Sequence, residues 1–136
     1  MRKLFIAAFM FVSSFGSNVM ADGHSIKMGI ILGFTGPIES LTPAMAASAE
    51  LAFKEASDSG SLLGGKKIEA MRADSTCVDS AAATAAAEGL ISGGVAAIMG
   101  ADCSGVTGAI ATNVAVPNGV VTVSYTHLTL PTNREV

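Results

Sequence analysis

The side chains best suited to chemistry lie in one short stretch, Asp102-Cys103-Ser104. An apolar run at 95–98 precedes it and is typical of a buried strand, and small residues at 108–114 follow and are typical of a helix. Ser104 therefore lies where that helix should begin, at a position where serine is a favoured cap. The backbone N–H groups there have no partner within the helix and favour a small anion such as a carboxylate. The stretch thus predicts a ligand-binding turn where a strand passes into a helix.

The remaining residue types argue against catalysis. A cysteine nucleophile needs a histidine base, and both histidines, His24 and His127, are near the ends of the sequence. Two cysteines with no histidine near them in sequence cannot complete a zinc shell. We therefore expect no enzyme, no metal site and no cofactor, although an exported α/β enzyme remains an alternative class.

One segment nearly matches a phosphate-binding loop. Residues 60–67 read glycine, four residues, glycine and lysine, but another lysine follows where serine or threonine is required. The segment also follows a predicted helix and precedes a predicted strand, the reverse of the required order. A plain turn is the better interpretation.

The N-terminal residues have the pattern of a secretory signal peptide. Arg2 and Lys3 precede an apolar run at 4–15, and the segment 19–21 offers small residues for cleavage before Asp22. The run is shorter than the ~20 residues of a membrane-spanning helix. Removal of 1–21 would make the net charge of −3 more negative, and without a basic cluster we expect no nucleic-acid partner. Export also favours a disulfide over a metal site for the two cysteines.

The rest of the chain alternates strand and helix patterns. We predict strands at 27–33, 68–73, 95–99 and 120–123, with helices at 42–57, 78–91 and 108–114 between them. Short connections in this order predict an α/β fold with a parallel βαβ sheet flanked by helices. The first strand should be buried on both faces, and the second should lie nearer an edge.

The first helix has the clearest sequence signals. Thr42 is expected to cap it and Pro43 to occupy its first turn. Glu50 and Lys54 are expected to pair on its outer side. The apolar face is predicted from one periodic set, Met45, Ala49, Ala52, Phe53 and Ala56.

Residues 125–136 do not continue the alternation. A helix should follow Ser124, but the tail has no helical periodicity and is similar to translated sequencing-adapter ends. We expect it to be non-native, with a natural terminus as the alternative.

Five motifs together resemble the N-terminal part of periplasmic branched-chain amino-acid-type solute-binding proteins, the receptors of ABC importers. The resemblance covers about 26–124 and implies an incomplete first lobe of a two-lobe fold, here residues 22–124. Open strand edges and uncovered apolar faces should then make the chain unstable or aggregation-prone alone. The motifs are Gly33-Phe34-Thr35-Gly36-Pro37, Leu63-Gly64-Gly65-Lys66-Lys67, Asp74-Ser75-Thr76-Cys77, Gly100-Ala101-Asp102-Cys103-Ser104 and Pro117-Asn118-Gly119.

The resemblance implies a disulfide and a set of ligand-binding residues. Cys77 and Cys103 are expected to be bonded, with two free buried thiols as the alternative. Ser104 is implied to hold the α-carboxylate and α-ammonium of an amino acid, unless it is a helix cap alone. The other implied ligand residues are Asp102 and Cys103 in the same loop, Leu41 or Thr42 after the first strand, and Ser124 after the fourth.

The implied function is that of an exported receptor. It would capture a branched-chain or other aliphatic amino acid, or a related amide or urea, in the periplasm as a monomer. It would then deliver this small-molecule ligand to an ABC permease in the inner membrane. An extracellular ligand-binding sensor domain of a signalling receptor is one alternative, and a structural lobe without a ligand is another.

Overall fold

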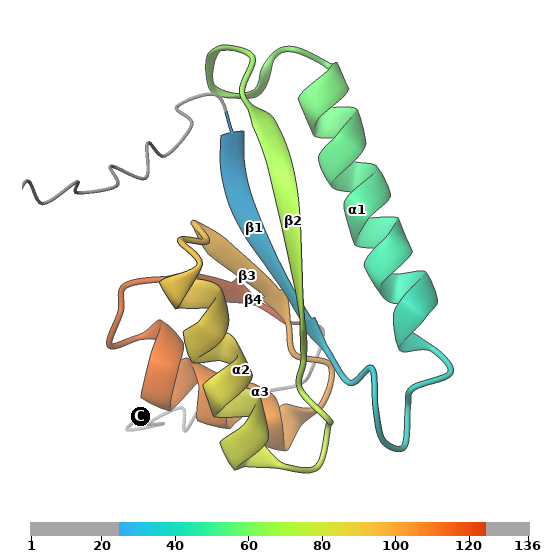
Figure 1. Ribbon diagram of the computed structural model, residues 1–136, viewed down its shortest axis with the longest axis vertical. Coiled ribbons are helices and arrows are strands. Elements are labelled where there is room, and N and C mark those ends of the chain that lie inside the picture. Colours follow the sequence, from blue (N-terminus) through green and yellow to red (C-terminus); the bar gives the residue numbers. More distant parts are fainter. Residues whose placement is uncertain (1–24, 125–136) are drawn as a thin grey trace, which may run out of the picture.

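A computed structural model describes residues 25–124, so the predicted signal peptide and the predicted non-native tail lie outside the described residues. Strands and helices alternate along this part of the chain (Figure 1). A short 3₁₀ turn at Leu62–Gly64 precedes the second strand, and a π-helical turn at Ala111–Ala115 continues the third helix. The main elements are β1 (Ser25–Leu32), α1 (Thr42–Asp58), β2 (Lys67–Asp74), α2 (Ser80–Ser92), β3 (Ala97–Gly100), α3 (Ser104–Ile110) and β4 (Val121–Val123).

The four strands form one sheet in the order β2-β1-β3-β4, and every pairing is parallel. The parallel α/β prediction is therefore confirmed, as is the edge position of the second strand. The chain leaves β1 for β2 on one side and then crosses to β3 on the other. Such a reversal between β1 and β3 opens a crevice at the carboxyl ends of the strands, where open α/β sheets bind ligands.

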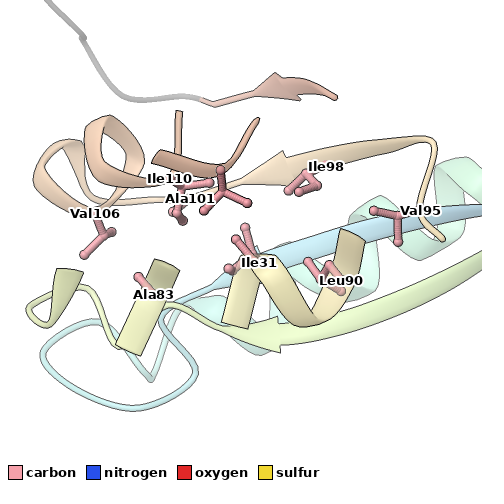
Figure 2. Packing of buried hydrophobic residues seen from close by; sticks show 10 residues of the cluster. Ile31, Ala83, Leu90, Val95, Ile98, Ala101, Val106 and Ile110 are labelled. Carbon is pink, nitrogen blue, oxygen red and sulfur yellow. The ribbon is translucent and has the colours of Figure 1, made fainter. Parts of the chain in front are cut away.

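The helices cover both faces of the sheet (Figure 1). On one face, Ile31 and Ile98 pack with the apolar sides of α2 and α3, including Leu90 and Val106 (Figure 2). On the other face, Ile30 and Leu32 pack against Ala46 of α1. All three β1 residues are fully buried, so the second half of the strand is covered on both sides as predicted, whereas Lys27 in its first half is exposed.

A close backbone approach ends β3. Gly100 has a φ of +117°, and a β-carbon at this position would lie 1.9 Å from the carbonyl oxygen of Ile31 in β1. Glycine lacks that carbon and adopts positive φ readily, so only glycine fits here. The loop that follows β3 is thereby held against the centre of the sheet.

Two predictions for α1 were wrong in detail. Leu41 is the N-cap residue and Thr42 is the first helical residue, with Pro43 in the first turn as expected. Glu50 does not pair with Lys54, because Arg72 on β2 binds it through two hydrogen bonds of 2.6 and 2.8 Å. Lys54 pairs with Asp58 instead. Glu50 pairs with Arg72 rather than with Lys54 because the planar guanidinium can bond to both carboxylate oxygens at once.

The predicted apolar face of α1 is confirmed only in part. Met45, Ala49 and Phe53 pack on the sheet as predicted, but Ala52 is exposed and Ala46 lies at the centre of the contact. Alanine is small and frequent in this helix, so its pattern defines the buried side poorly.

One part of the sheet is left uncovered among the described residues. Val121 and Val123 are 63% and 61% exposed, and Val123 lies in register with Met99 of β3. Paired residues of parallel strands share a face, so both valines lie on the α1 side, beyond the reach of α1. A groove between α1 and β3 adjoins them and is lined by Met45, Ser48, Ala49, Ala52 and Met99. Within residues 25–124, no helix combines the length and apolar character needed to cross a membrane.

Candidate functional site

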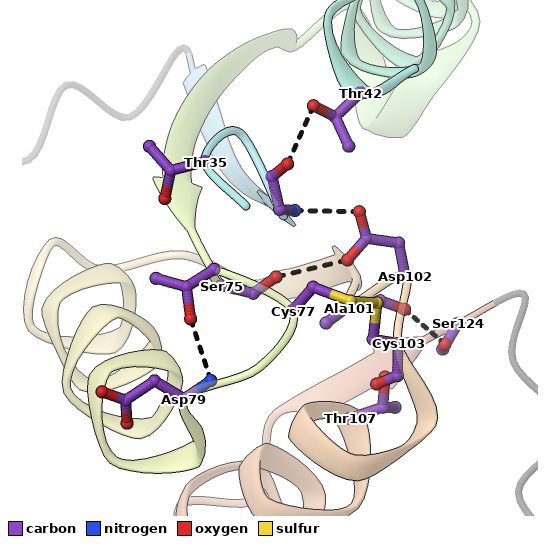
Figure 3. The surroundings of a disulfide bond; sticks show 12 residues. Thr35, Thr42, Ser75, Cys77, Asp79, Ala101, Asp102, Cys103, Thr107 and Ser124 are labelled. Atoms are coloured by element: carbon purple, nitrogen blue, oxygen red, sulfur yellow. Dashed lines mark hydrogen bonds between the residues drawn. A yellow bond between two sulfur atoms is a disulfide. The ribbon is translucent and has the colours of Figure 1, made fainter. Parts of the chain in front are cut away.

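Three loops meet at the carboxyl ends of the strands (Figure 3). We call them together the carboxyl edge, defined as residues 33–41 after β1, 75–79 after β2 and 101–104 after β3. Direct links between side chains and backbone hold these loops together. The edge includes the point between β1 and β3 where the strand order reverses.

A disulfide joins two of the loops. Cys77 and Cys103 are bonded, with their Cα atoms 5.3 Å apart and a sequence separation of 26 (Figure 3). The predicted pairing is confirmed, and free thiols are excluded for these two residues. Because Cys103 is also the N-cap residue of α3, the disulfide fixes the position where α3 begins.

Asp102 joins all three loops. Its Oδ2 accepts a 2.8 Å hydrogen bond from the backbone N–H of Gly33, and its Oδ1 accepts a 3.2 Å bond from the hydroxyl of Ser75 (Figure 3). Ser75 is fully buried. The structure therefore shows the Asp102 carboxylate turned toward the neighbouring loops. No role for Ser75 was predicted, since it lies 27 residues from Asp102 in sequence.

A second carboxylate, Asp74, ties the end of β2 to the loop after β1. It accepts hydrogen bonds from the hydroxyl and backbone N–H of Thr35, at 2.6 and 3.3 Å, and from the N–H of Thr76 at 2.8 Å. Burial raises the pKa of this carboxyl, but the hydrogen bonds from Thr35, Thr76 and Phe34 outweigh burial, so the net shift is downward. Asp74 is therefore held in its charged form.

Ser104 is the first residue of α3 and is exposed. The N-cap position predicted for it belongs to Cys103, which makes no side-chain cap bond. Within residues 25–124, the hydroxyl of Ser104 makes no hydrogen bond. As the first residue of α3, Ser104 lies at the carboxyl edge beside the backbone N–H groups of the first helical turn, which have no acceptor within the helix.

The two candidates after β1 have different surroundings. Leu41 is 61% exposed. Thr42 is fully buried, and its hydroxyl donates to the carbonyl of Gly33 at 3.1 Å (Figure 3). It is also 3.4 Å from the carbonyl oxygen of Glu39. Thr42 thus fastens the start of α1 to the end of β1, and Leu41 presents an apolar surface next to it.

Ser124, which follows β4, is brought to the same region. Its hydroxyl donates a 2.6 Å hydrogen bond to the carbonyl of Ala101 (Figure 3). Thr122 makes a similar 2.9 Å bond to the carbonyl of Gly100. The end of β4 is therefore anchored to the loop that carries Asp102, Cys103 and Ser104.

The chemistry available at the carboxyl edge is that of hydrogen bonding. Hydroxyl and backbone N–H groups can hold an anion, and the disulfide removes both cysteine thiols. In the described part of the chain, no group of three or more His, Cys, Asp or Glu side chains could hold a metal ion. No buried polar side-chain atom there lacks a hydrogen-bond partner.

Comparison with known proteins gives a consistent result. The model of the family described as periplasmic binding protein matches residues 25–135. Among solved structures, the branched-chain amino acid transporter substrate-binding protein LivJ from Streptococcus pneumoniae, in complex with isoleucine, is 30% identical with a TM-score of 0.66. The leucine-binding protein LivK from Thermotoga maritima is 27% identical with a TM-score of 0.63. An ABC transporter solute-binding protein from R. palustris, in complex with benzoate, is 27% identical with a TM-score of 0.61.

These matches cover most of this chain but a smaller share of the solved proteins. LivJ and the benzoate-bound protein each align with 74% of this chain, and LivK with 73%. The aligned part is 28% of LivJ and 27% of each of the other two. A search of curated proteins gave no match.

Proposed function

Because the chain belongs to the periplasmic binding protein family, we propose that it forms part of an exported receptor that captures an aliphatic amino acid for an ABC permease in the inner membrane. The exposed Ser104 hydroxyl carries this proposal, since it lies at the start of α3 on the carboxyl edge. The signal peptide, the periplasmic location, the monomeric state and the absence of covalent chemistry belong to the same proposal.

The ligand group proposed for Ser104 is a carboxylate. A hydroxyl and free N–H groups at a helix start favour a small anion, and hydrogen bonds to a charged group are stronger than those between neutral groups. The ligands of two similar structures, isoleucine and benzoate, share a carboxylate and differ in the rest of the molecule. This shared group supports assigning Ser104 to the carboxylate rather than to the side chain.

The surrounding residues would set the shape of the site. We propose that Leu41 packs against the apolar part of the ligand and that Ser124 borders the site from the end of β4. Cys103 contributes through the disulfide that fixes the start of α3. Thr42 contributes by holding the end of β1 against α1.

The test is a titration of the 136-residue chain and its Ser104→Ala variant with L-isoleucine, followed by NMR. The matched control is Ser92→Ala, at the far end of α2. L-Isoleucine is used at millimolar concentrations, because the part aligned with this chain is less than a third of LivJ and we expect a partial site to bind weakly. L-Isoleucinamide, which lacks the carboxylate, serves as a second probe.

We expect isoleucine to shift the amide resonance of Ser104 and its neighbours. Loss of one hydrogen bond to a charged group is worth ~1.5–3 kcal/mol, so Ser104→Ala should weaken binding by roughly tenfold or more. Ser92→Ala should bind as the wild type does, and isoleucinamide should bind more weakly than isoleucine. Equal binding by wild type and Ser104→Ala, or no shift near Ser104, would contradict the proposal.

A further inference from the structure

Asp102 occupies the centre of the carboxyl edge, and we propose that it is a positioning residue, which sets the three loops relative to one another without contacting the ligand. The inference rests on the proposed function, because the loops that Asp102 holds are those proposed to receive the carboxylate. It changes the role expected for Asp102 from the sequence, which was that of a ligand contact.

The bond to Gly33 extends the pairing of the two central strands. The backbone register of β1 and β3 ends at Ile31 opposite Gly100. Continuing this register by two positions would place Gly33 opposite Asp102. There, the side-chain carboxylate of Asp102 accepts the N–H of Gly33 at 2.8 Å. A side chain thus supplies the acceptor where the backbone ladder has ended.

The bond to Ser75 connects the third loop. The backbone N–H of Ser75 donates to the carbonyl of Leu32 at 2.9 Å, and its hydroxyl donates to Asp102. Ser75 is therefore attached to β1 through its backbone and to the loop after β3 through its side chain. Because Ser75 is fully buried, water cannot readily replace Asp102 as its partner.

Asp102 and the neighbouring disulfide both join the loops after β2 and β3, but Asp102 is also hydrogen-bonded to the loop after β1. The Cys77–Cys103 bond links the loops after β2 and β3 covalently, and Cys77 lies against Gly33 of the loop after β1 without a bond to it. Among the described residues, the hydrogen bond between Gly33 and Asp102 connects residues 33–41 to residues 101–104. We infer that this side-chain hydrogen bond helps to set the spacing between Leu41 and Ser104 across the edge.

Both carboxylate oxygens already accept hydrogen bonds from within the protein. A ligand contact would require Asp102 to use its charge, for example toward an ammonium group. A positioning role requires only its shape and its polar atoms. Asparagine separates these possibilities, since its oxygen can accept from Gly33 and its amide can donate to the Ser75 hydroxyl, which also accepts.

The experiment compares Asp102→Asn and Asp102→Ala in the 136-residue chain. The first measurement is the exchange rate of the Gly33 amide hydrogen by NMR, and the second is the affinity for L-isoleucine. Ser75→Ala serves as a partial variant, because it removes one bond to Asp102 and leaves the bond to Gly33. Asp79→Asn is the matched control, since Asp79 caps α2 and does not join two loops.

We expect Asp102→Ala to accelerate exchange of the Gly33 amide by about tenfold or more and to weaken isoleucine binding by a similar factor. Asp102→Asn should restore both to within about threefold of wild type. Asp79→Asn should leave the exchange of Gly33 unchanged. If Asp102→Ala fails to fold, Asp102→Asn and Ser75→Ala, which each retain the acceptor for Gly33, supply the comparison.

Two outcomes would overturn the inference. Unchanged exchange at Gly33 in Asp102→Ala would show that the bond does not hold the loop. Loss of isoleucine affinity in Asp102→Asn, with Gly33 still protected, would show that Asp102 contacts the ligand through its charge. If the wild type binds no isoleucine, the proposed function fails, while the exchange of Gly33 still decides whether Asp102 positions the loops.

Discussion

The hydroxyl of Thr35 donates a 2.6 Å hydrogen bond to Oδ2 of Asp74, which joins the loop after β1 to the last residue of β2. These residues are 39 positions apart in the sequence. Together with the N–H groups of Thr35 and Thr76, this bond stabilises the charged carboxylate. The stability of the chain should therefore depend on pH through Asp74.

The first prediction concerns Asp74→Asn. Folding lowers the pKa of Asp74 below its ordinary value of 3.8. An acid with a lowered pKa stabilises the folded state above its unfolded pKa, and this contribution disappears as the pH falls through the folded pKa. Asp74→Asn should therefore lose about 1–3 kcal/mol of unfolding free energy at pH 7, and the loss should shrink as the pH falls below 3.8.

Urea unfolding of both proteins between pH 7 and pH 2 measures this dependence. Thr35→Val should show a smaller loss with the same trend, while Thr35→Ser, which keeps the hydroxyl, should resemble the wild type. A difference between wild type and Asp74→Asn that stays constant over this pH range would refute the assignment.

The second prediction concerns the disulfide. Cys77 and Cys103 close a loop with a sequence separation of 26. On the chain-entropy model, such a crosslink stabilises the fold by about 3.5 kcal/mol, because it restricts the unfolded chain. The Cys77→Ser/Cys103→Ser variant should lose about this much in urea unfolding. Reductant should destabilise the wild type and leave the double variant unchanged; an equal effect on both would argue against the crosslink as the cause.

The third prediction concerns Gly100. Because a β-carbon there would lie 1.9 Å from the carbonyl oxygen of Ile31, Gly100→Ala must move β3 away from β1. We expect a loss of roughly 3 kcal/mol or more, or failure to fold. Gly89→Ala is the matched control, since Gly89 lies in α2 and the added carbon would meet no atom within 4 Å apart from its chain neighbours and the backbone of its own helix. Gly89→Ala should gain about 0.5–1 kcal/mol of stability, measured by thermal unfolding. If Gly100→Ala were as stable as Gly89→Ala, the close approach of Gly100 to β1 would be disproved.

The fourth prediction concerns the uncovered side of β4. Val121 is 63% exposed on the edge strand of the described sheet, and exposed apolar edges promote association. Val121→Lys should therefore reduce concentration-dependent association, measured by sedimentation velocity. Val116→Lys is the control, because Val116 is 76% exposed but lies outside the sheet. If both lysines reduce association equally, added charge rather than the edge explains the result.

Most of the fold could be predicted because local patterns define it. The apolar run near 27–33 and the alternating run near 68–73 correspond to β1 and β2 within two residues at each end. The predicted disulfide depended on the resemblance to a family, since nothing in the spacing of Cys77 and Cys103 specifies their pairing.

The parts that could not be predicted depend on contacts between distant residues. Glu50 has a suitable partner four residues away in Lys54, but the packing of α1 on β2 brings Arg72 within 2.6 Å. Likewise, the sequence places Asp102 in the predicted site, but it does not predict its partners Gly33 and Ser75, which lie in the loops after β1 and β2. Side-chain partners across a sheet become evident only when the strand order is known.

The position of β1 in the sheet has a consequence for how the chain folds. Among the described strands, β1 is synthesised first, yet one of its neighbours is β3, and Gly33 and Asp102 are 69 positions apart in the sequence. Contacts between such distant residues form slowly, because a large loop must close before they are gained. β1 is thus synthesised well before β3, and its pairing with β3 forms late. Until Asp102 has been synthesised, the apolar side chains of β1 remain accessible to chaperones and to other chains.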